Sequence, residues 1–268
     1  MPPRTHFLAW VRPPSPCSPQ QPAVQDAAPA RYADPMVRLE DPALDGLPPE
    51  ALLGPLNDVE RKYAPARLFV AGSRALLQDG ARVAVIGSRK ASHQGLTNAR
   101  QIAEILVARG MVVVSGLAEG IDAVAHETAL AQRGRTIAVL GTPLDQTYPA
   151  THRALQQRIM REQLAITQFA PGSRVGRGNF PMRNRTMALI SHASIIVEAG
   201  ETSGSLHQGW EALRLGRPLV ILSAVAENTG LTWPAKMVEY GAVVLPVSRL
   251  ADVLDLLPTG AELGLDAL

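Results

Sequence analysis

Five short runs of aliphatic and β-branched residues recur along the middle and C-terminal parts of the chain. They are RVAVIG (82–87), MVVVS (111–115), TIAVLG (136–141), SIIVEA (194–199) and PLVILS (218–223). Runs that are apolar at consecutive positions, rather than at alternate ones, are typical of parallel strands buried on both faces. Because longer segments separate them, the pattern predicts an α/β fold of the Rossmann-like, doubly wound type. Helices are expected on both faces of a mainly parallel sheet.

The segments between the runs have the spacing of amphipathic helices. TNARQIAEILVARG (97–110) places apolar residues three or four positions apart and reaches a glycine, as does AVAHETALAQRG (123–134). A glycine just after the last periodic residue commonly ends a helix, and here each glycine precedes the next strand by one or two residues. We therefore expect these two helices to end at Gly110 and Gly134.

Composition divides the chain into three parts. Residues 1–50 are rich in Pro, Ala, Ser and Gln without periodicity, so they bury too little apolar surface to offset the entropy of ordering, and we expect disorder there. Met36 is an alternative start, because the composition becomes ordinary at that point. Residues 51–245 form the predicted core domain. Residues 246–268 are expected to form a short helix and a tail, with too few basic residues for a winged helix.

Composition and charge narrow the class of protein. The 268 residues are 46% hydrophobic, which is enough for one large domain with a core. Cys17 is the single cysteine, so a disulfide within the chain is excluded and a reducing cytoplasm is expected. No apolar run approaches the roughly 18 residues of a membrane helix, and the N-terminus lacks the apolar stretch of a leader peptide. The formal charge is only +2, so any polyanion binding depends on locally clustered arginines.

Small and polar residues follow four of the predicted strands. They are Gly87, Ser88 and Arg89; Ser115 and Gly116; Gly141; and the segment GETSGS (200–205), which contains Ser203, Gly204 and Ser205. Because the carboxyl ends of parallel strands lie at one edge of a sheet, these loops are expected to line one crevice. Glycines let a ligand approach the backbone, and the following helices present free N–H groups that favour an anion such as phosphate. The alternative is that these residues only make tight turns.

Arginines reinforce the expectation of a phosphate site. Arg89 lies in the first loop, and SRVGRGNFPMRNR (173–185) contains Arg174, Arg177, Arg183 and Arg185 before a predicted helix. The guanidinium fork binds two phosphate oxygens at once, which makes arginine a preferred contact for nucleic-acid backbones. Phe180 in the same segment either stacks on a base or belongs to the core.

Structural roles are the alternative for two of these arginines. Arg183 or Arg185 could instead form an ion pair within the protein, with Glu198, Glu201 or Asp145 as the partner.

No catalytic or cofactor motif is found. GSR is not GxGxxG, and GxxxxGK[ST] is absent, so dinucleotide and Walker-type sites are not predicted. His126, His152, His192 and His207 have no partner at metal-ligand spacing, and Ser203 and Ser205 have no recognisable His/Asp arrangement. We expect Asp122 to cap or orient its loop. The sequence therefore predicts a non-catalytic binding protein without a cofactor or a metal.

Six motifs in order resemble the DprA/Smf family. They are GSRKAS (87–92), SGLAEGIDAVAH (115–126), TIAVLGTPLDQTYP (136–149), NFPMRNR (179–185), IIVEA (195–199) and SGSL (203–206), and the similarity spans residues 65–245. The resemblance implies a protein that binds single-stranded DNA, shields it in transformable bacteria and helps to load RecA. It also implies a homodimer. It assigns Gly87, Ser88 and Arg89 to the DNA pocket, with FPMRNR (including Arg183, Asn184 and Arg185) and SGSL on the same edge.

The chain also departs from that family pattern. Glu119 stands where the family commonly has arginine, Thr142 and Pro143 where it has a glycine-containing GxGLD segment, and His152 where it has asparagine. Two other functions are therefore kept beside single-strand binding. One is a nucleotide-binding enzyme similar to the LOG phosphoribohydrolases, although their PGGxGT signature is replaced here by EAGETSGS (198–205). The other is a nucleotide sensor on the same type of fold.

Overall fold

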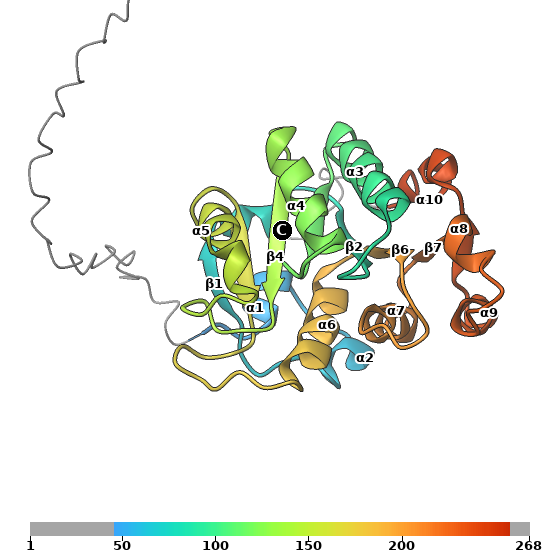
Figure 1. Ribbon diagram of the computed structural model, residues 1–268. Helices are drawn as coiled ribbons and strands as arrows, with labels where there is room; N and C mark the ends of the chain where they lie inside the picture. The colour runs from blue at the N-terminus through green and yellow to red at the C-terminus, as the bar shows by residue number, and fades with distance from the viewer. Residues whose placement is uncertain (1–45, 258–268) are drawn as a thin grey trace, which may run out of the picture. The chain divides into compact units, whose positions relative to one another are not determined.

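The computed structural model describes residues 46–257, which form an eight-stranded sheet with helices on both faces (Figure 1). The strand order is β1-β5-β4-β3-β2-β6-β7-β8, and every neighbouring pair is parallel except β1 and β5. The strands are β1 Phe69–Gly72, β2 Arg82–Gly87, β3 Val112–Ser115, β4 Arg135–Leu140, β5 Leu164–Thr167, β6 Ala193–Glu198, β7 Leu219–Leu222 and β8 Val243–Leu245. The predicted doubly wound α/β fold is confirmed.

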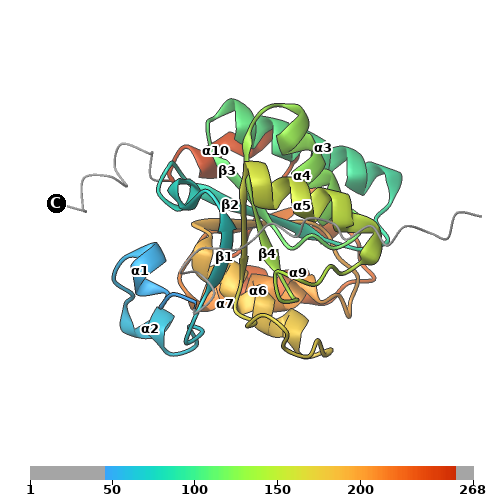
Figure 2. The same cartoon turned by 90° about the vertical axis from the view of Figure 1, so that its left-hand side faces the viewer.

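Helices cover the sheet in two layers. Figure 2 shows α3 (His93–Ala108), α4 (Ile121–Ala131) and α5 (Arg153–Glu162) on one face, with α6 (Asn179–Ile190), α7 (Ser205–Arg214) and α9 (Trp233–Glu239) on the other. The remaining helices are short: α1 Glu50–Leu53, α2 Asp58–Arg61, α8 Ser223–Ala226, α10 Ala251–Leu254, and the 3-10 turns η2 Arg74–Leu77, η3 Ala150–His152 and η4 Val247–Arg249. None of the helices in residues 46–257 is long and apolar enough to cross a membrane.

The central strands are buried along their whole length, because helices lie over both of their faces. Val83, Val113, Ile137 and Ile195, one from each of β2, β3, β4 and β6, have no exposed surface. This burial explains why the corresponding runs are apolar at consecutive positions. All five predicted strands are present, within one or two residues of their predicted ends.

Three strands were not predicted from the sequence. β1, β5 and β8 have only three or four residues each, and β1 pairs antiparallel with β5 at one edge of the sheet. β1 and β8 are the two edge strands and contain exposed positions, so they lack the unbroken apolar run of a central strand. At the end of β1, Gly72 has φ of 105°, and a Cβ there would collide with the Gln163 carbonyl.

The two helix-ending glycines have different roles. Gly110 follows α3 with φ of 66°, the left-handed conformation expected after a helix. α4, however, ends at Ala131, and the left-handed residue after it is Arg133, with φ of 54°. Gly134 is needed for packing instead, because a Cβ at this position would overlap Val107 of α3. The left-handed residue that ends the helix therefore lies one position before the expected Gly134.

The ends of the described chain are held on the core. Most of the predicted disordered segment (residues 1–45) and the last part of the predicted tail (residues 258–268) lie outside the described residues. Leu47 pairs with Leu68 through two backbone hydrogen bonds. Glu60 of α2 forms a 2.7 Å ion pair with Arg217, and both side chains are only 16% exposed. This pair docks α2 beside α7.

A buried histidine joins the amino ends of two central strands. The Arg82 backbone N–H, at the start of β2, donates to His192 Nδ1 at 2.9 Å, and Arg82 Nε donates to the Ile190 carbonyl at 2.6 Å. Burial, together with the guanidinium groups of Arg82 and Arg217, lowers the pKa of His192 from 6.5 to about 3. The folded protein therefore holds this imidazole neutral.

We predict that His192 makes the protein sensitive to acid. The unfolded chain takes up this proton near pH 6.5 and the folded one only near pH 3, so the contribution is complete above pH 6.5 and is lost as the pH falls toward 3. This one group changes the free energy of unfolding by at most about 1.4 kcal/mol per pH unit. Urea unfolding across this pH range should give a free energy of unfolding that falls less steeply with falling pH for His192→Gln than for the unchanged protein. The exposed His93→Gln serves as the control, and equal slopes in the two variants would contradict the assignment.

Candidate nucleic-acid interface

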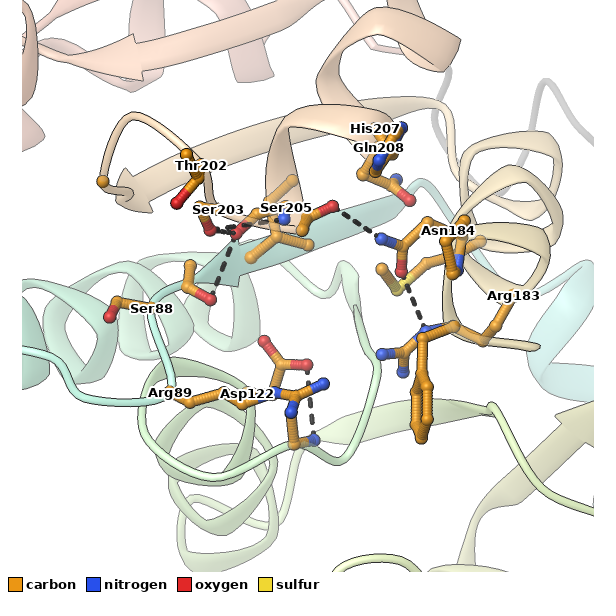
Figure 3. Close-up of a pocket in the computed structure, with 18 residues that line it drawn as sticks. Ser88, Arg89, Asp122, Arg183, Asn184, Thr202, Ser203, Ser205, His207 and Gln208 are labelled. Carbon is orange, nitrogen blue, oxygen red and sulfur yellow. Dashed lines mark hydrogen bonds between the residues drawn. The ribbon is translucent and has the colours of Figure 1, made fainter. Parts of the chain in front are cut away.

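A polar pocket of about 350 Å³ opens at the carboxyl edge of the sheet, where α6 and α7 begin (Figure 3). In Figure 3, Ser203 and Ser205 lie on the side of α7, Arg183 and Asn184 extend from α6, and Arg89 and Asp122 lie opposite the serines. The pocket is lined by Ile86, Gly87, Ser88, Arg89, Ala118, Asp122, Phe180, Pro181, Arg183, Asn184, Met187, Gly200, Thr202, Ser203, Gly204, Ser205, His207 and Gln208.

The predicted site residues separate into three groups. Eight of them line this pocket: Gly87, Ser88, Arg89, Arg183, Asn184, Ser203, Gly204 and Ser205. Gly116 and Gly141 line a smaller neighbouring pocket of about 60 Å³, which shares Arg89, Phe180 and Arg183 with the first. Ser115 and Arg185 line neither pocket. The Ser115 hydroxyl is buried and donates to the Val85 carbonyl at 2.7 Å, and the Arg185 guanidinium lies 5.3 Å from the ring centre of Tyr63.

Arg183 is a buried structural arginine at the base of both pockets. Its Nη1 donates to the carbonyls of Gly116 and Val139, the latter at 2.9 Å, and its Nε donates to Asn184 Oδ1 at 2.9 Å. Burial lowers the pKa of this guanidinium, and the nearby Asp122 carboxylate opposes that shift. Arg183 therefore joins the loop after β3 to strand β4.

The ion-pair partners considered for Arg183 and Arg185 are engaged elsewhere. Glu198 accepts hydrogen bonds from the Ser92 backbone N–H at 2.9 Å and from the Ser92 hydroxyl at 2.5 Å. Glu201 accepts from the Thr232 backbone N–H at 2.9 Å. Asp145 accepts from the Gly172 backbone N–H at 3.3 Å. The alternative of a structural ion pair with one of these three carboxylates is therefore wrong for Arg183, whose anchors are carbonyl oxygens.

Asn184 and the two serines hold the amino end of α7 against the sheet. Asn184 Nδ2 donates to the Gly204 carbonyl at 2.9 Å, and the Ser205 hydroxyl donates to the Gly87 carbonyl at 3.2 Å. The hydroxyls of Ser203 and Ser205 are 2.7 Å apart and share a hydrogen bond. The positive end of the α7 dipole is thus fixed at the wall of the pocket, where it favours a negative ligand.

Asp122 both orients a loop and lines the pocket. Its Oδ2 accepts hydrogen bonds from the backbone N–H groups of Gly116, at 3.2 Å, and Ala118, at 3.4 Å. Burial raises the pKa of this carboxyl, against the opposing effect of Arg183. The negative charge that would repel a phosphate is therefore disfavoured at this position. The expected loop-orienting role is confirmed by these bonds.

Glycines near the site make room for the protein's own side chains. A Cβ at Gly116 would overlap the guanidinium of Arg183. A Cβ at Gly141 would lie 2.8 Å from Phe180 Cδ1. These two glycines were predicted to let a ligand approach the backbone, and in the structure they admit Arg183 and Phe180.

Arg89 is the exposed cation shared by the two pockets. Its guanidinium lies 5.5 Å from the ring centre of Phe180, within the range of a cation–π contact. Phe180 in turn lies 5.3 Å from Tyr148, centre to centre, and Tyr148 is 52% exposed. Arg89 therefore combines a free charge with a neighbouring aromatic surface. Arg174 and Arg177 are exposed but line neither pocket.

Two of the histidines are hydrogen bonded within the fold. His126 is buried and bonds through Nδ1 to the Thr136 hydroxyl at 2.7 Å, and His152 Nδ1 lies 2.9 Å from the Leu117 carbonyl. Ser203 and Ser205 bond to each other and to Gly87, and no histidine in residues 46–257 hydrogen bonds to either serine. The same part of the chain contains no group of three or more His, Cys, Asp or Glu arranged to hold a metal. The arrangement is suited to binding an anion.

Sequence reasoning missed two polar residues of the main pocket. His207 and Gln208 line it from the first turn of α7. Their position next to SGSL is the signal that could have identified them, because the first turn of a helix faces the same crevice as the loop before it.

Comparison with known proteins finds relatives over the same part of the chain. The profile of the DNA recombination-mediator protein A family matches residues 52–258. DNA processing protein DprA of Streptococcus pneumoniae is 41% identical over 154 residues, covering 58% of this chain and 54% of that protein. DprA of Bacillus subtilis is 30% identical over 178 residues, covering 66% and 60%. Protein Smf of Escherichia coli is 34% identical over 223 residues, covering 83% and 59%. The chain thus spans little more than half of each relative.

Two solved structures share the fold. The DprA structure from Streptococcus pneumoniae has a TM-score of 0.66 and 34% identity, over 75% of this chain and 72% of that one. DNA processing protein A from Helicobacter pylori has a TM-score of 0.65 and 26% identity, over 78% and 92%. The latter structure concerns the single-stranded DNA binding mode of that protein. These findings confirm the resemblance to the DprA/Smf family.

We predict that Arg183 is required for stability. Replacing it with methionine leaves the carbonyls of Gly116 and Val139 without this donor in a buried region, which should lower the free energy of unfolding by about 2–5 kcal/mol. The control is Arg185→Met, two residues along the same helix. Because the Arg185 side chain is exposed, this replacement should change the free energy of unfolding by less than about 1 kcal/mol. Urea denaturation at neutral pH measures the free energy of unfolding of both variants. An equally small loss in Arg183→Met and Arg185→Met would contradict the anchoring role of Arg183.

Proposed function

The chain belongs to the DNA recombination-mediator protein A family, and from this premise we propose that it binds single-stranded DNA, without catalysis, at the carboxyl edge of its sheet. The observation that carries the proposal is Arg89, an exposed guanidinium placed between two pockets and beside the ring of Phe180. Its charge is free to contact a phosphate, because Arg183 rather than Arg89 fixes the loops of the site.

The main pocket supplies the groups that a backbone phosphate requires. Arg89 offers a charge-assisted contact, and the hydroxyls of Ser88 and Thr202 together with the amino end of α7 lie around the same space. The Asp122 carboxyl at the same pocket is engaged by the backbone N–H groups of Gly116 and Ala118. A phosphate of a flexible strand therefore fits the pocket better than a neutral ligand does.

An exposed aromatic ring favours a single strand over a duplex. Tyr148 is 52% exposed and lies beside the half-buried Phe180. An unpaired base can stack on such a ring, whereas the bases of a duplex are already stacked and covered. We expect a single strand to bind more tightly than a duplex of the same sequence.

The wider role follows from the family and extends the same proposal. DprA/Smf proteins are named for DNA processing, and we propose that this chain shields single-stranded DNA in the cytoplasm, acts as a homodimer and assists the loading of RecA. Size-exclusion chromatography with light scattering tests the dimer. RecA filament assembly on strands pre-bound by this protein tests the loading role.

We predict that Arg89→Ala weakens single-strand binding without unfolding the protein. Loss of one charge-assisted contact of about 1.5–3 kcal/mol should reduce affinity about 10- to 150-fold. The decline of log affinity with log salt concentration should also become less steep, by the contribution of about one phosphate contact. Fluorescence anisotropy with a labelled oligonucleotide at two salt concentrations measures both effects. Arg100→Ala on the exposed side of α3 removes the same charge elsewhere and should leave affinity nearly unchanged.

Two results would contradict this assignment. A lower unfolding temperature for Arg89→Ala, with normal DNA binding by the folded fraction, would make Arg89 structural. Tight binding and base release from nucleoside monophosphates, with no binding of a longer strand, would favour the nucleotide-hydrolase alternative instead.

A further inference from the structure

The smaller pocket differs from the main one in charge and in its walls. Its volume of about 60 Å³ leaves room for only a few water molecules, so it can admit the edge of a flat ring but not a whole nucleotide. Tyr148 and Phe180 form aromatic walls, and Arg89 and Glu119 supply opposite charges at the lining. These are the elements of a slot that takes the edge of a base, with an aromatic surface beside it.

Glu119 is available to a ligand. Its side chain is exposed and forms no hydrogen bond or ion pair with any residue in the range 46–257. It immediately precedes Gly120, the residue that caps α4, and the positive end of a helix favours a carboxylate there. The phosphate binding proposed for the larger pocket does not use Glu119, because a carboxylate repels a phosphate.

Two other polar side chains in the slot are already hydrogen bonded within the protein. The Thr142 hydroxyl donates to the Gln146 carbonyl at 2.8 Å, and Arg183 donates to carbonyl oxygens of the protein. Hydrogen-bond recognition in this slot therefore rests mainly on the carboxylate of Glu119, an acceptor, and on the guanidinium of Arg89, a donor.

From this arrangement we infer that the smaller pocket selects guanine among the bases of a bound strand, through Glu119. Guanine presents two neighbouring donors, N1–H and the exocyclic N2 amino group, which together match the two oxygens of a carboxylate. Its O6 acceptor lies beside them and suits Arg89. In adenine, cytosine and thymine, an acceptor adjoins the donor on the same edge and would face the carboxylate. The inference rests on the proposed single-strand binding.

The test compares oligonucleotides that differ by one amino group per base. Oligo(dT) strands carrying dG at every third position are compared with strands carrying deoxyinosine there, because hypoxanthine lacks only the N2 amino group of guanine. Anisotropy titration of the full chain should show about 5- to 10-fold tighter binding to the dG strand. Glu119→Ala should reduce this ratio to within about twofold. Glu127→Ala, an exposed carboxylate further along α4, should preserve it.

The ratio between strands separates base selection from general electrostatics. Removing either carboxylate strengthens binding to every strand by reducing repulsion, and this effect cancels in the ratio. Equal affinity of the unmodified chain for the dG and deoxyinosine strands, or a preference that persists in Glu119→Ala, would overturn the inference while single-strand binding stands. Absence of binding to any strand would overturn the proposed function and this inference with it.

Discussion

The binding edge depends on one buried guanidinium. Arg183 donates to the carbonyls of Gly116 and Val139 and to Asn184, and Asn184 donates in turn to the Gly204 carbonyl before α7. Two neighbouring side chains of α6, Arg183 and Asn184, therefore tie the ends of β3 and β4 to the start of α7. Burying a cation is costly, and it is tolerated here because its fork meets fixed oxygen acceptors. Without it, the loops that form the pocket would have no common anchor.

This anchoring lets the edge keep a second arginine free. Arg183 fills the space that the missing side chain of Gly116 leaves, whereas Arg89 remains exposed beside Phe180. The two arginines thus divide the structural role from the binding role that we propose, although both line the same two pockets. A site that is held in place before the ligand arrives loses less conformational entropy on binding.

The sequence predicts the fold better than the roles of individual residues. Buried parallel strands have apolar residues at every position, so β2, β3, β4, β6 and β7 were found, whereas the edge strands β1 and β8 contain exposed positions and lack this signal. The crevice was also found, because strand order fixes which loops meet. Sequence could not separate Arg183 from Arg89, since both are arginines near glycines and polar residues and only tertiary packing shows which is buried. For the same reason Ser115 was assigned to the site although its hydroxyl faces Val85.

The central claim is that single-stranded DNA lies on the carboxyl edge of this sheet. Hydrogen–deuterium exchange measured by mass spectrometry, with and without an unstructured single-stranded oligonucleotide, tests that location most directly. The account predicts slower exchange in peptides covering the loop after β2, the segment before α4 and the start of α7 (residues 87–92, 116–122 and 202–208). Slower exchange confined to other parts of the chain, with these three segments unchanged on binding, would contradict it.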